Sequence, residues 1–144
     1  MSYFPKEMPR PVPAMNDTEF LRGCAERHLR FQACAACGML RHPPMPICSH
    51  CHSTAEKWVE APTTAKVYSF TVVHHASHPA VKASLPYVVA LLEFPALPGV
   101  RLVSNITHVD PSEVRIGMQV DLWWDDIGED MFLPRFRPME KIKA

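Results

Sequence analysis

Cys34-Ala35-Ala36-Cys37 and Cys48-Ser49-His50-Cys51 are two Cys-x-x-Cys motifs, separated by residues 38–47, in a sequence of 144 residues. Structural zinc is held by four thiolate or imidazole ligands in a tetrahedron, and each such turn directs two sulfur atoms at one point. Gly38 and His52 directly follow the two motifs, and both residue types tolerate the positive φ that such turns need. The spacing therefore predicts one metal centre with four ligands, Cys34, Cys37, Cys48 and Cys51.

Four thiolates complete the coordination shell, so we predict a structural zinc site and not a catalytic one. Iron in a rubredoxin-like setting uses the same ligands and is the leading alternative metal. A redox dithiol is the weaker interpretation, because two motifs in one short hairpin converge on a metal. Three nearby histidines are interpreted as bystanders or outer-shell partners: His42, His50 and His52. The fifth cysteine, Cys24, lies away from both motifs and is expected to be a small buried residue.

The overall composition limits the function classes that fit. Fifteen Lys and Arg residues balance fifteen Asp and Glu residues, which argues against a dedicated nucleic-acid binder or attachment to anionic membranes. No apolar run approaches the roughly 20 residues that span a bilayer. The first residues carry no charged leader followed by an apolar stretch, so we expect no secretory signal and a cytoplasmic protein.

The N-terminal region divides into an arm and a helix. Residues 1–15 contain Pro5, Pro9, Pro11 and Pro13, so we expect an extended segment, either a disordered tail or an arm that lies along a partner. Residues 16–30 carry an apolar stripe with helical spacing and are predicted to form one helix. Asn16 and Glu19 are placed to form a reciprocal N-terminal cap.

After the cysteine segment the pattern changes to short strands with β-branched and aromatic residues. Five strands are predicted, at residues 66–73, 87–94, 100–106, 120–124 and 131–136. The continuous apolar run at 87–94 suggests a strand that is covered on both faces. Five strands in one small module fit a partly open Greek-key barrel of the OB type. We therefore predict a mainly β protein with an arm and helix (1–30), a zinc ribbon (31–60) and a five-stranded OB-fold barrel (61–144).

Catalytic groups are sparse outside the cysteine segment. His74, His75 and His78 follow the first barrel strand, but no nucleophile motif or phosphate loop accompanies them, so a polar loop is the better interpretation. The acidic turn at residues 125–130 is expected to be solvated. Trp123 and Trp124 should point to opposite faces of their strand, one toward the core and one toward an interface.

The order of these parts resembles the rubredoxin-like zinc-ribbon/OB-fold family of acyl-CoA-associated proteins, formerly a domain of unknown function. The resemblance covers about residues 16–140. It rests on five stretches: Phe31-Gln32-Ala33-Cys34-Ala35-Ala36-Cys37-Gly38, Arg41-His42-Pro43-Pro44-Met45-Pro46-Ile47-Cys48-Ser49-His50-Cys51, Val67-Tyr68-Ser69-Phe70-Thr71-Val72-Val73, Ile116-Gly117-Met118-Gln119-Val120, and the closing segment Leu133-Pro134-Arg135-Phe136-Arg137-Pro138.

The resemblance implies a non-catalytic accessory subunit of a thiolase-superfamily enzyme, which condenses, cleaves or transfers acyl groups. The partner would supply the catalytic residues, and this chain would stabilise the assembly and contact acyl-CoA. Arg135 and Arg137 are the candidates for contacts with coenzyme A phosphates. Two alternatives stay open: an OB-fold module for single-stranded nucleic acid, and a stand-alone enzyme that uses the histidine cluster.

Overall fold

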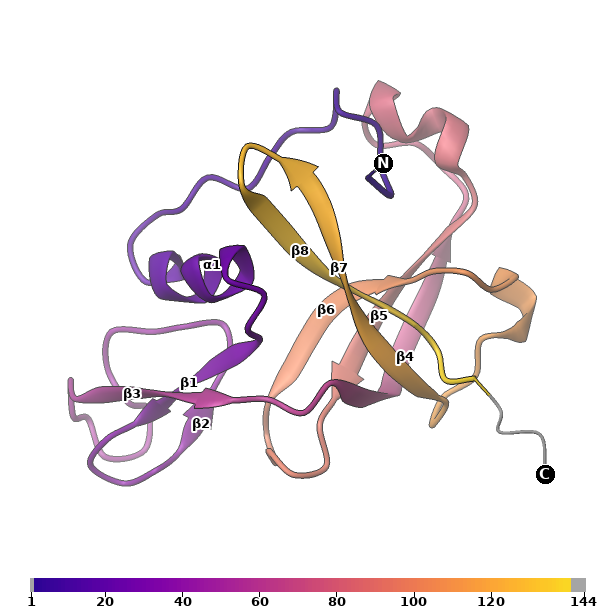
Figure 1. The fold of residues 1–144 in the computed structure, drawn as a ribbon. Coiled ribbons are helices and arrows are strands. Elements are labelled where there is room, and N and C mark those ends of the chain that lie inside the picture. The colour runs from indigo at the N-terminus through magenta and orange to yellow at the C-terminus, as the bar shows by residue number, and fades with distance from the viewer. Residues whose placement is uncertain (1, 141–144) are drawn as a thin grey trace.

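The computed structural model describes residues 2–140. A three-stranded ribbon sheet lies beside a five-stranded barrel, and the helix α1 packs against both (Figure 1). The mainly β architecture predicted from the sequence, with its helix, ribbon and barrel, is confirmed.

Helix α1 (Asp17–Ala25) is shorter than predicted. Its end is a Schellman motif, in which the backbone N–H of His28 bonds to the carbonyl of Gly23 at 2.8 Å and that of Arg27 bonds to Cys24 at 2.9 Å. Arg27 adopts a positive φ of 61°, which turns the chain out of the helix. The predicted cap is also wrong, because the side chain of Asn16 makes no capping hydrogen bond.

The ribbon sheet has the strand order β2-β1-β3 and is antiparallel. Its strands are β1 (Arg30–Cys34), β2 (Leu40–Arg41) and β3 (Glu56–Glu60). The sequence did not predict β3, because its charged residues alternate poorly with apolar ones and most of the strand is exposed. Pairing with β1 along its whole length creates this strand.

The barrel has the strand order β4-β5-β6-β8-β7 and closes on itself, as an OB fold does. Its strands are β4 (Thr64–Val73), β5 (Tyr87–Glu93), β6 (Arg101–Ile106), β7 (Gln119–Gly128) and β8 (Met131–Pro138). All five predicted strands are present. Two short 3-10 helices, η1 (Pro79–Ser84) and η2 (Pro111–Glu113), lie in the connections.

The seam between β6 and β8 closes the barrel with little backbone pairing. These parallel strands share one paired position, Ile106 with Phe136. The hydroxyl of Ser104 donates to the carbonyl of Pro134 at 2.7 Å, and the backbone N–H and hydroxyl of Thr107 both donate to Phe136. Pro134 has no N–H for a ladder, so side chains provide the remaining hydrogen bonds of the seam.

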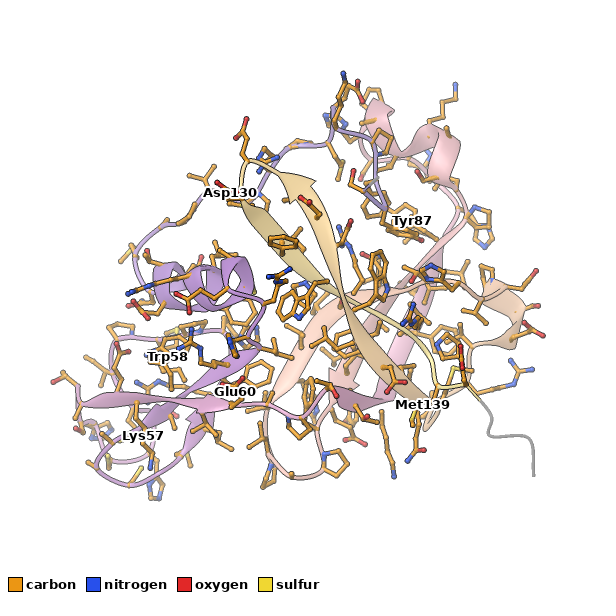
Figure 2. All side chains as sticks on the ribbon, in the orientation of Figure 1. Lys57, Trp58, Glu60, Tyr87, Asp130 and Met139 are labelled. Carbon is orange, nitrogen blue, oxygen red and sulfur yellow. The ribbon has the colours of Figure 1, made fainter. Side chains whose placement is uncertain are left out.

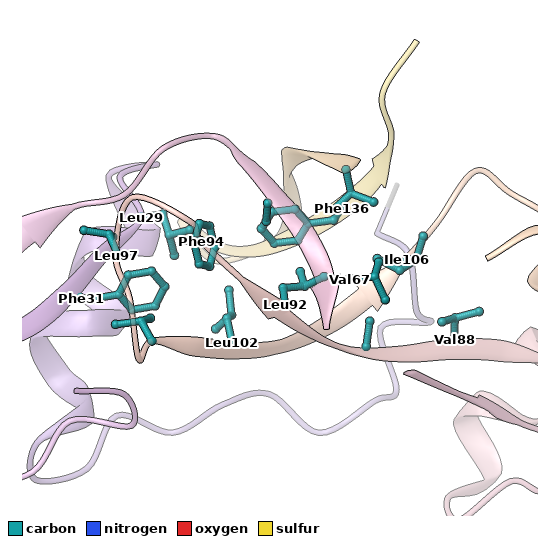
Figure 3. Packing of buried hydrophobic residues seen from close by; sticks show 14 of the residues in the cluster. Leu29, Phe31, Val67, Val88, Leu92, Phe94, Leu97, Leu102, Ile106 and Phe136 are labelled. Carbon is teal, nitrogen blue, oxygen red and sulfur yellow. The ribbon is translucent and has the colours of Figure 1, made fainter. Parts of the chain in front are cut away.

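One hydrophobic core joins the ribbon to the barrel (Figure 3). The ring of Phe31, on β1, lies 5.2 Å from that of Phe94, and Phe94 lies 6.3 Å from Phe136 on β8. All three rings are buried. Strand β5 points Val88, Ala90 and Leu92 into this core, whereas its other face is only half-buried, so the prediction that both faces are covered is wrong.

The N-terminal arm packs on the barrel of its own chain. The backbone N–H of Tyr3 donates to the carboxylate of Asp125 at 3.1 Å, and the ring of Phe4 meets that of Tyr87 edge-on at 5.1 Å. The arm is therefore neither a disordered tail nor free to lie along a partner in this conformation.

Candidate metal centre

The two Cys-x-x-Cys motifs fold into turns with the same hydrogen-bond pattern. The backbone N–H of Gly38 donates to the carbonyl of Cys34 at 2.8 Å, and that of His52 donates to Cys48 at 2.9 Å. Gly38 has φ of 82° and His52 has φ of 63°, so the predicted positive φ is confirmed at both positions. The backbone N–H of the first cysteine in each turn also donates to a carbonyl five residues later, that of Cys34 to Met39 and that of Cys48 to Ser53.

The sulfur atoms of the four predicted cysteines converge on one point. All four lie within 4.8 Å of one another, and the Sγ atoms of Cys34 and Cys51 are 3.5 Å apart. Cys37 and Cys48 are 3.7 Å apart. A tetrahedron with metal–sulfur bonds near 2.3 Å requires sulfur separations of about 3.8 Å. The donor set and its geometry thus fit a zinc ion, which would cross-link the two turns of the ribbon.

Backbone amides favour the thiolate form at the first cysteine of each turn. The N–H of Cys37 donates to the Sγ of Cys34 at 3.4 Å, and this bond lowers the pKa of Cys34 to about 6. The amide of Cys51 likewise lowers the pKa of Cys48. Because metal ligation requires the thiolate, these amides prepare both buried cysteines for metal binding.

A buried glutamine fixes the hairpin that joins the two turns. The side-chain oxygen of Gln32, on β1, accepts from the Nε of Arg41 at 2.7 Å and from the backbone N–H of Met45 at 2.8 Å. Its amide nitrogen donates to the carboxylate of Glu56 on β3. Gln32 is fully buried and connects β2, the hairpin and β3. This role of Gln32 cannot be predicted from the sequence, because a lone glutamine in a strand carries no local signal.

The histidines near the centre are not brought into it. The four cysteines are the one group of three or more His, Cys, Asp and Glu side chains, among residues 2–140, whose ligand atoms are close enough to share an ion. His42 instead packs between Phe20 and Phe31, at ring distances of 4.9 and 5.2 Å. Burial there lowers the pKa of His42 to about 4. His50 and His52 are exposed.

The other candidate residues have structural positions. In the cluster after β4, His78 accepts a hydrogen bond from the backbone N–H of Ala80 and caps η1, while His74 and His75 are exposed. The two tryptophans lie on opposite faces as predicted: Trp124 packs on the core, and Trp123 donates to the hydroxyl of Thr107 at 2.9 Å. Cys24 is buried, as predicted.

The two arginines predicted to contact coenzyme A have different surroundings. The Nε of Arg135 lies 3.1 Å from the carboxylate of Asp125, and its Nη1 donates to the side chain of Asn105 at 2.7 Å. Asp125 is 0% exposed and the side chain of Arg135 is 12% exposed. The prediction that Asp125 belongs to a solvated turn is therefore wrong. Arg137 is exposed.

Family models match most of the chain. Residues 22–56 match the rubredoxin-like zinc ribbon domain of ChsH2, and residues 58–125 match the C-terminal OB-fold domain of ChsH2. Within the described residues, no helix combines the length and the apolar character needed to cross a bilayer.

Curated relatives carry names of enzyme subunits and scaffolds. A probable enoyl-CoA hydratase alpha subunit from Thermomonospora curvata is 47% identical over 131 residues, which are 90% of this chain and 40% of that protein. A 3-oxo-4,17-pregnadiene-20-carboxyl-CoA hydratase alpha subunit from Mycobacterium tuberculosis is 38% identical, over 81% of this chain and 36% of that protein. This chain thus spans well under half of these two relatives. A DUF35 domain-containing scaffold protein from Methanocaldococcus jannaschii is 32% identical, over 74% of this chain and 79% of that protein.

A solved structure has the same fold at high sequence identity. It is described as an Ltp2-ChsH2(DUF35) aldolase, and its matching chain is 43% identical, with a TM-score of 0.81 over 90% of this chain and 98% of that one. A DUF35 protein from Sulfolobus solfataricus, 22% identical with a TM-score of 0.60 over 84% of this chain and 83% of that one, shares the fold. The chain therefore belongs to the DUF35 family, and its two parts are the zinc ribbon and the OB-fold domain described for ChsH2.

Proposed function

We propose that this chain is a non-catalytic accessory subunit of an enzyme complex that acts on acyl-CoA. Its partner would be a thiolase-superfamily enzyme that condenses, cleaves or transfers acyl groups. The observation that carries the proposal is the match to the ChsH2 chain of an Ltp2-ChsH2(DUF35) aldolase, over almost all of that chain. The hydratase subunit and scaffold names of the relatives agree with a role inside an enzyme assembly.

The described residues support a subunit without its own chemistry. The metal centre has four thiolate ligands, which leave no open position for substrate or water. The buried ion pair of Arg135 with Asp125 is held by further hydrogen bonds to Asn105 and Tyr3. Reactive groups of the complex would then belong to the partner.

The tip of the ribbon is the surface that we propose for the partner. Met39, Met45 and Ile47 lie on the hairpin between the two cysteine turns, and each side chain is 41–52% exposed. Methionine and isoleucine on a rigid, metal-bound hairpin provide an apolar contact at low entropic cost, and apolar side chains are enriched at the centres of interfaces.

Affinity capture of the tagged full-length chain from its native cells tests the proposal. We expect a thiolase-like enzyme to be retained in stoichiometric amount, and acyl-CoA turnover to require both proteins. The double variant Met45→Glu/Ile47→Glu should lose the partner. Ile116→Glu, the same change at an exposed apolar residue of the barrel, is the matched control and should retain it.

A retained set without any acyl-CoA enzyme would contradict the accessory-subunit proposal. Turnover of acyl-CoA by the isolated chain would contradict the non-catalytic role. Tight, salt-dependent binding of single-stranded oligonucleotides would instead favour the alternative OB-fold function.

Contact with coenzyme A is a separate proposal, and Arg137 is the better of the two candidates. Its side chain is exposed, whereas Arg135 is engaged with Asp125. Loss of one charge-assisted hydrogen bond to a phosphate corresponds to about a tenfold weaker affinity. We expect this effect for Arg137→Gln in the assembled complex, measured by calorimetry, with Lys57→Gln as the control. Unchanged affinity would remove Arg137 as a contact.

The division into an arm with helix (1–30), a ribbon (31–60) and a barrel (61–144) also stays a proposal, as does the cytoplasmic location. Limited proteolysis of the zinc-bound chain tests the division, because cleavage should concentrate at the exposed residues beside the two boundaries, 25–28 and 62–63. Cleavage spread evenly along the chain, without preference for these two sites, would contradict the boundaries.

A further inference from the structure

The first residues of the chain form a strap across the barrel. We use this name for residues 2–10, which begin beside η1 and run to the β7–β8 hairpin, where Arg10 is bound (Figure 1). Hollows between the strap and the barrel show that it does not fill the space beneath it. One of about 350 Å³ lies against β5, β6 and β8, and another of about 670 Å³ lies between the strap, Ser84 and the β7–β8 hairpin.

The first attachment point combines a hydrogen bond with aromatic contacts. The backbone N–H of Tyr3 donates to the carboxylate of Asp125. The guanidinium of Arg135 lies 5.7 Å from the ring of Tyr3 and 5.3 Å from the ring of Phe4, within the range of cation–π attraction. Tyr87 completes the site by its edge-on contact with Phe4, and it lies beside the first residues of the chain in Figure 2.

The second attachment point is Arg10. Its guanidinium donates to the carbonyl oxygens of Ile127 and Gly128, and it lies 3.7 Å from the carboxylate of Glu129. Beyond this point the chain leaves the barrel surface: Val12 is 80% exposed and Met15 is 89% exposed. The strap is thus held at two points and tethered to α1 by an exposed segment.

The strap lies where OB barrels take their ligands. Such barrels bind oligonucleotides and oligosaccharides over their second and third strands, between the first and last inter-strand loops. The equivalent elements here are β5 and β6, the loop that contains η1, and the β7–β8 hairpin. The buried carboxylate of Asp125 neutralises Arg135 beneath the strap, so this groove does not favour a phosphate-bearing ligand. The carboxylate of Asp125 can accept from a backbone N–H of a ligand, and Arg135 and Tyr87 can pack against its aromatic rings.

We propose that this groove binds an extended peptide segment of the partner enzyme, and that the strap is an internal ligand which must swing out first. The strap itself shows the chemistry that the groove recognises: two adjacent aromatic residues and a backbone N–H that donates to the buried carboxylate of Asp125. The identity of the partner rests on the proposed function, whereas the groove and its peptide chemistry rest on the contacts of the strap.

The test uses the full-length chain and a fluorescent synthetic peptide with the sequence of residues 2–11. The variant Tyr3→Ala/Phe4→Ala removes the ring contacts of the strap with Arg135 and Tyr87, so the strap should occupy the groove less often, while the barrel residues are unchanged. A tethered segment competes at an effective concentration near the millimolar range, so we expect this variant to bind the peptide at least about tenfold more tightly than the wild type. Lys6→Ala, a change at an exposed strap residue, should match the wild type.

Two further measurements show whether the double variant is still correctly folded. Adding Tyr87→Ala to the double variant should weaken peptide binding again, because the ring that receives Phe4 is lost. Hydrogen exchange should become faster in residues 4–10 of the double variant and stay unchanged in β5 to β8.

Equal peptide affinity of wild type and double variant, or no binding to either, would overturn the proposal. So would tighter binding of coenzyme A or an oligonucleotide, but not of the peptide, by the double variant. Capture of the partner separates the two proposals: if a thiolase-like enzyme is retained while peptide binding fails, the strap proposal fails alone.

Discussion

The ribbon and the barrel reach a fixed structure by different means. The ribbon has three strands, one of only two residues, and its centre is occupied by four cysteines and the polar network of Gln32. The barrel encloses a continuous apolar core. A hairpin of this size buries too little apolar surface to fold alone, so metal binding supplies the free energy that hydrophobic burial supplies in the barrel. Phe31 joins the two parts because it lies on β1 and is buried against Phe94.

The largest expected effect comes from breaking the metal centre. In Cys48→Ser the ribbon should lose tight zinc binding, which in a complete structural site contributes on the order of 10 kcal/mol to folding, and should unfold locally. The barrel should stay folded because all buried residues of the shared core, except Leu29 and Phe31, come from residues 65–136. Metal analysis and hydrogen exchange check this, and Cys24→Ala, which removes a buried cysteine outside the centre, should keep the full zinc content. Simultaneous unfolding of the barrel would show that the two parts are one cooperative unit.

The second effect concerns the barrel core. Phe136 is fully buried, so Phe136→Ala should lower the free energy of unfolding by about 3–5 kcal/mol through lost burial and a cavity. Urea unfolding measures the loss, and the zinc content at low urea should be unchanged. Phe132→Ala, at a half-buried position of the same strand, should cost clearly less. Loss of zinc in Phe136→Ala would contradict the independence of the ribbon.

The third effect is a pH dependence at the contact between helix and ribbon. Burial lowers the pKa of His42 from 6.5 to about 4. As the pH falls through this window, the unfolded chain takes up a proton that the folded chain does not, so stability decreases, by up to about 3 kcal/mol. Urea unfolding at pH values from about 4.5 to about 7 measures the slope, with zinc content followed in parallel.

His42→Leu should reduce this pH dependence, and His75→Leu, at an exposed loop histidine, should leave it as it is. An unchanged slope in His42→Leu would assign the acid sensitivity to other groups, such as the metal-binding thiolates.

The smallest effect compares the two cysteine turns. Gly38 and His52 occupy the same place with positive φ, where a side chain costs about 1 kcal/mol or more. His52→Gly should therefore stabilise the zinc-bound ribbon by about 0.5–1 kcal/mol, and Gly38→Ala should destabilise it by a similar amount. Competition with a zinc chelator measures both. If both substitutions changed the zinc affinity equally and in the same direction, the two turns would not be equivalent.

Features encoded by neighbouring residues were predictable from the sequence. The ligands, the turn conformations at Gly38 and His52, and the five barrel strands follow from spacing and local pattern. The end of α1 did not, because the apolar stripe continues to Leu29 whereas Arg27 turns the chain and places Leu29 in the core of the barrel.

Features created by contacts distant in sequence were not predictable. Strand β3 forms because it pairs with β1, about 25 residues earlier in the register. Asp125 sits in an acidic stretch that looks solvated, yet Tyr3 and Arg135 cover it. The contact with Tyr3 depends on the path of the N-terminal arm, which its prolines do not specify, and the contact with Arg135 depends on the pairing of β7 with β8.

The seam between β6 and β8 has a mechanical consequence. The seam has a single paired position and a proline in β8, so it is held mainly by the hydroxyl of Ser104 and by the backbone N–H and hydroxyl of Thr107. A force that pulls β6 away from β8 would separate this seam before any other pair of neighbouring strands. The other pairs are antiparallel ladders, in which several backbone hydrogen bonds resist the force together. The β6–β8 seam is thus the weakest junction between strands of the barrel, and the hydrogen bond from Arg135 on β8 to Asn105 on β6 spans it.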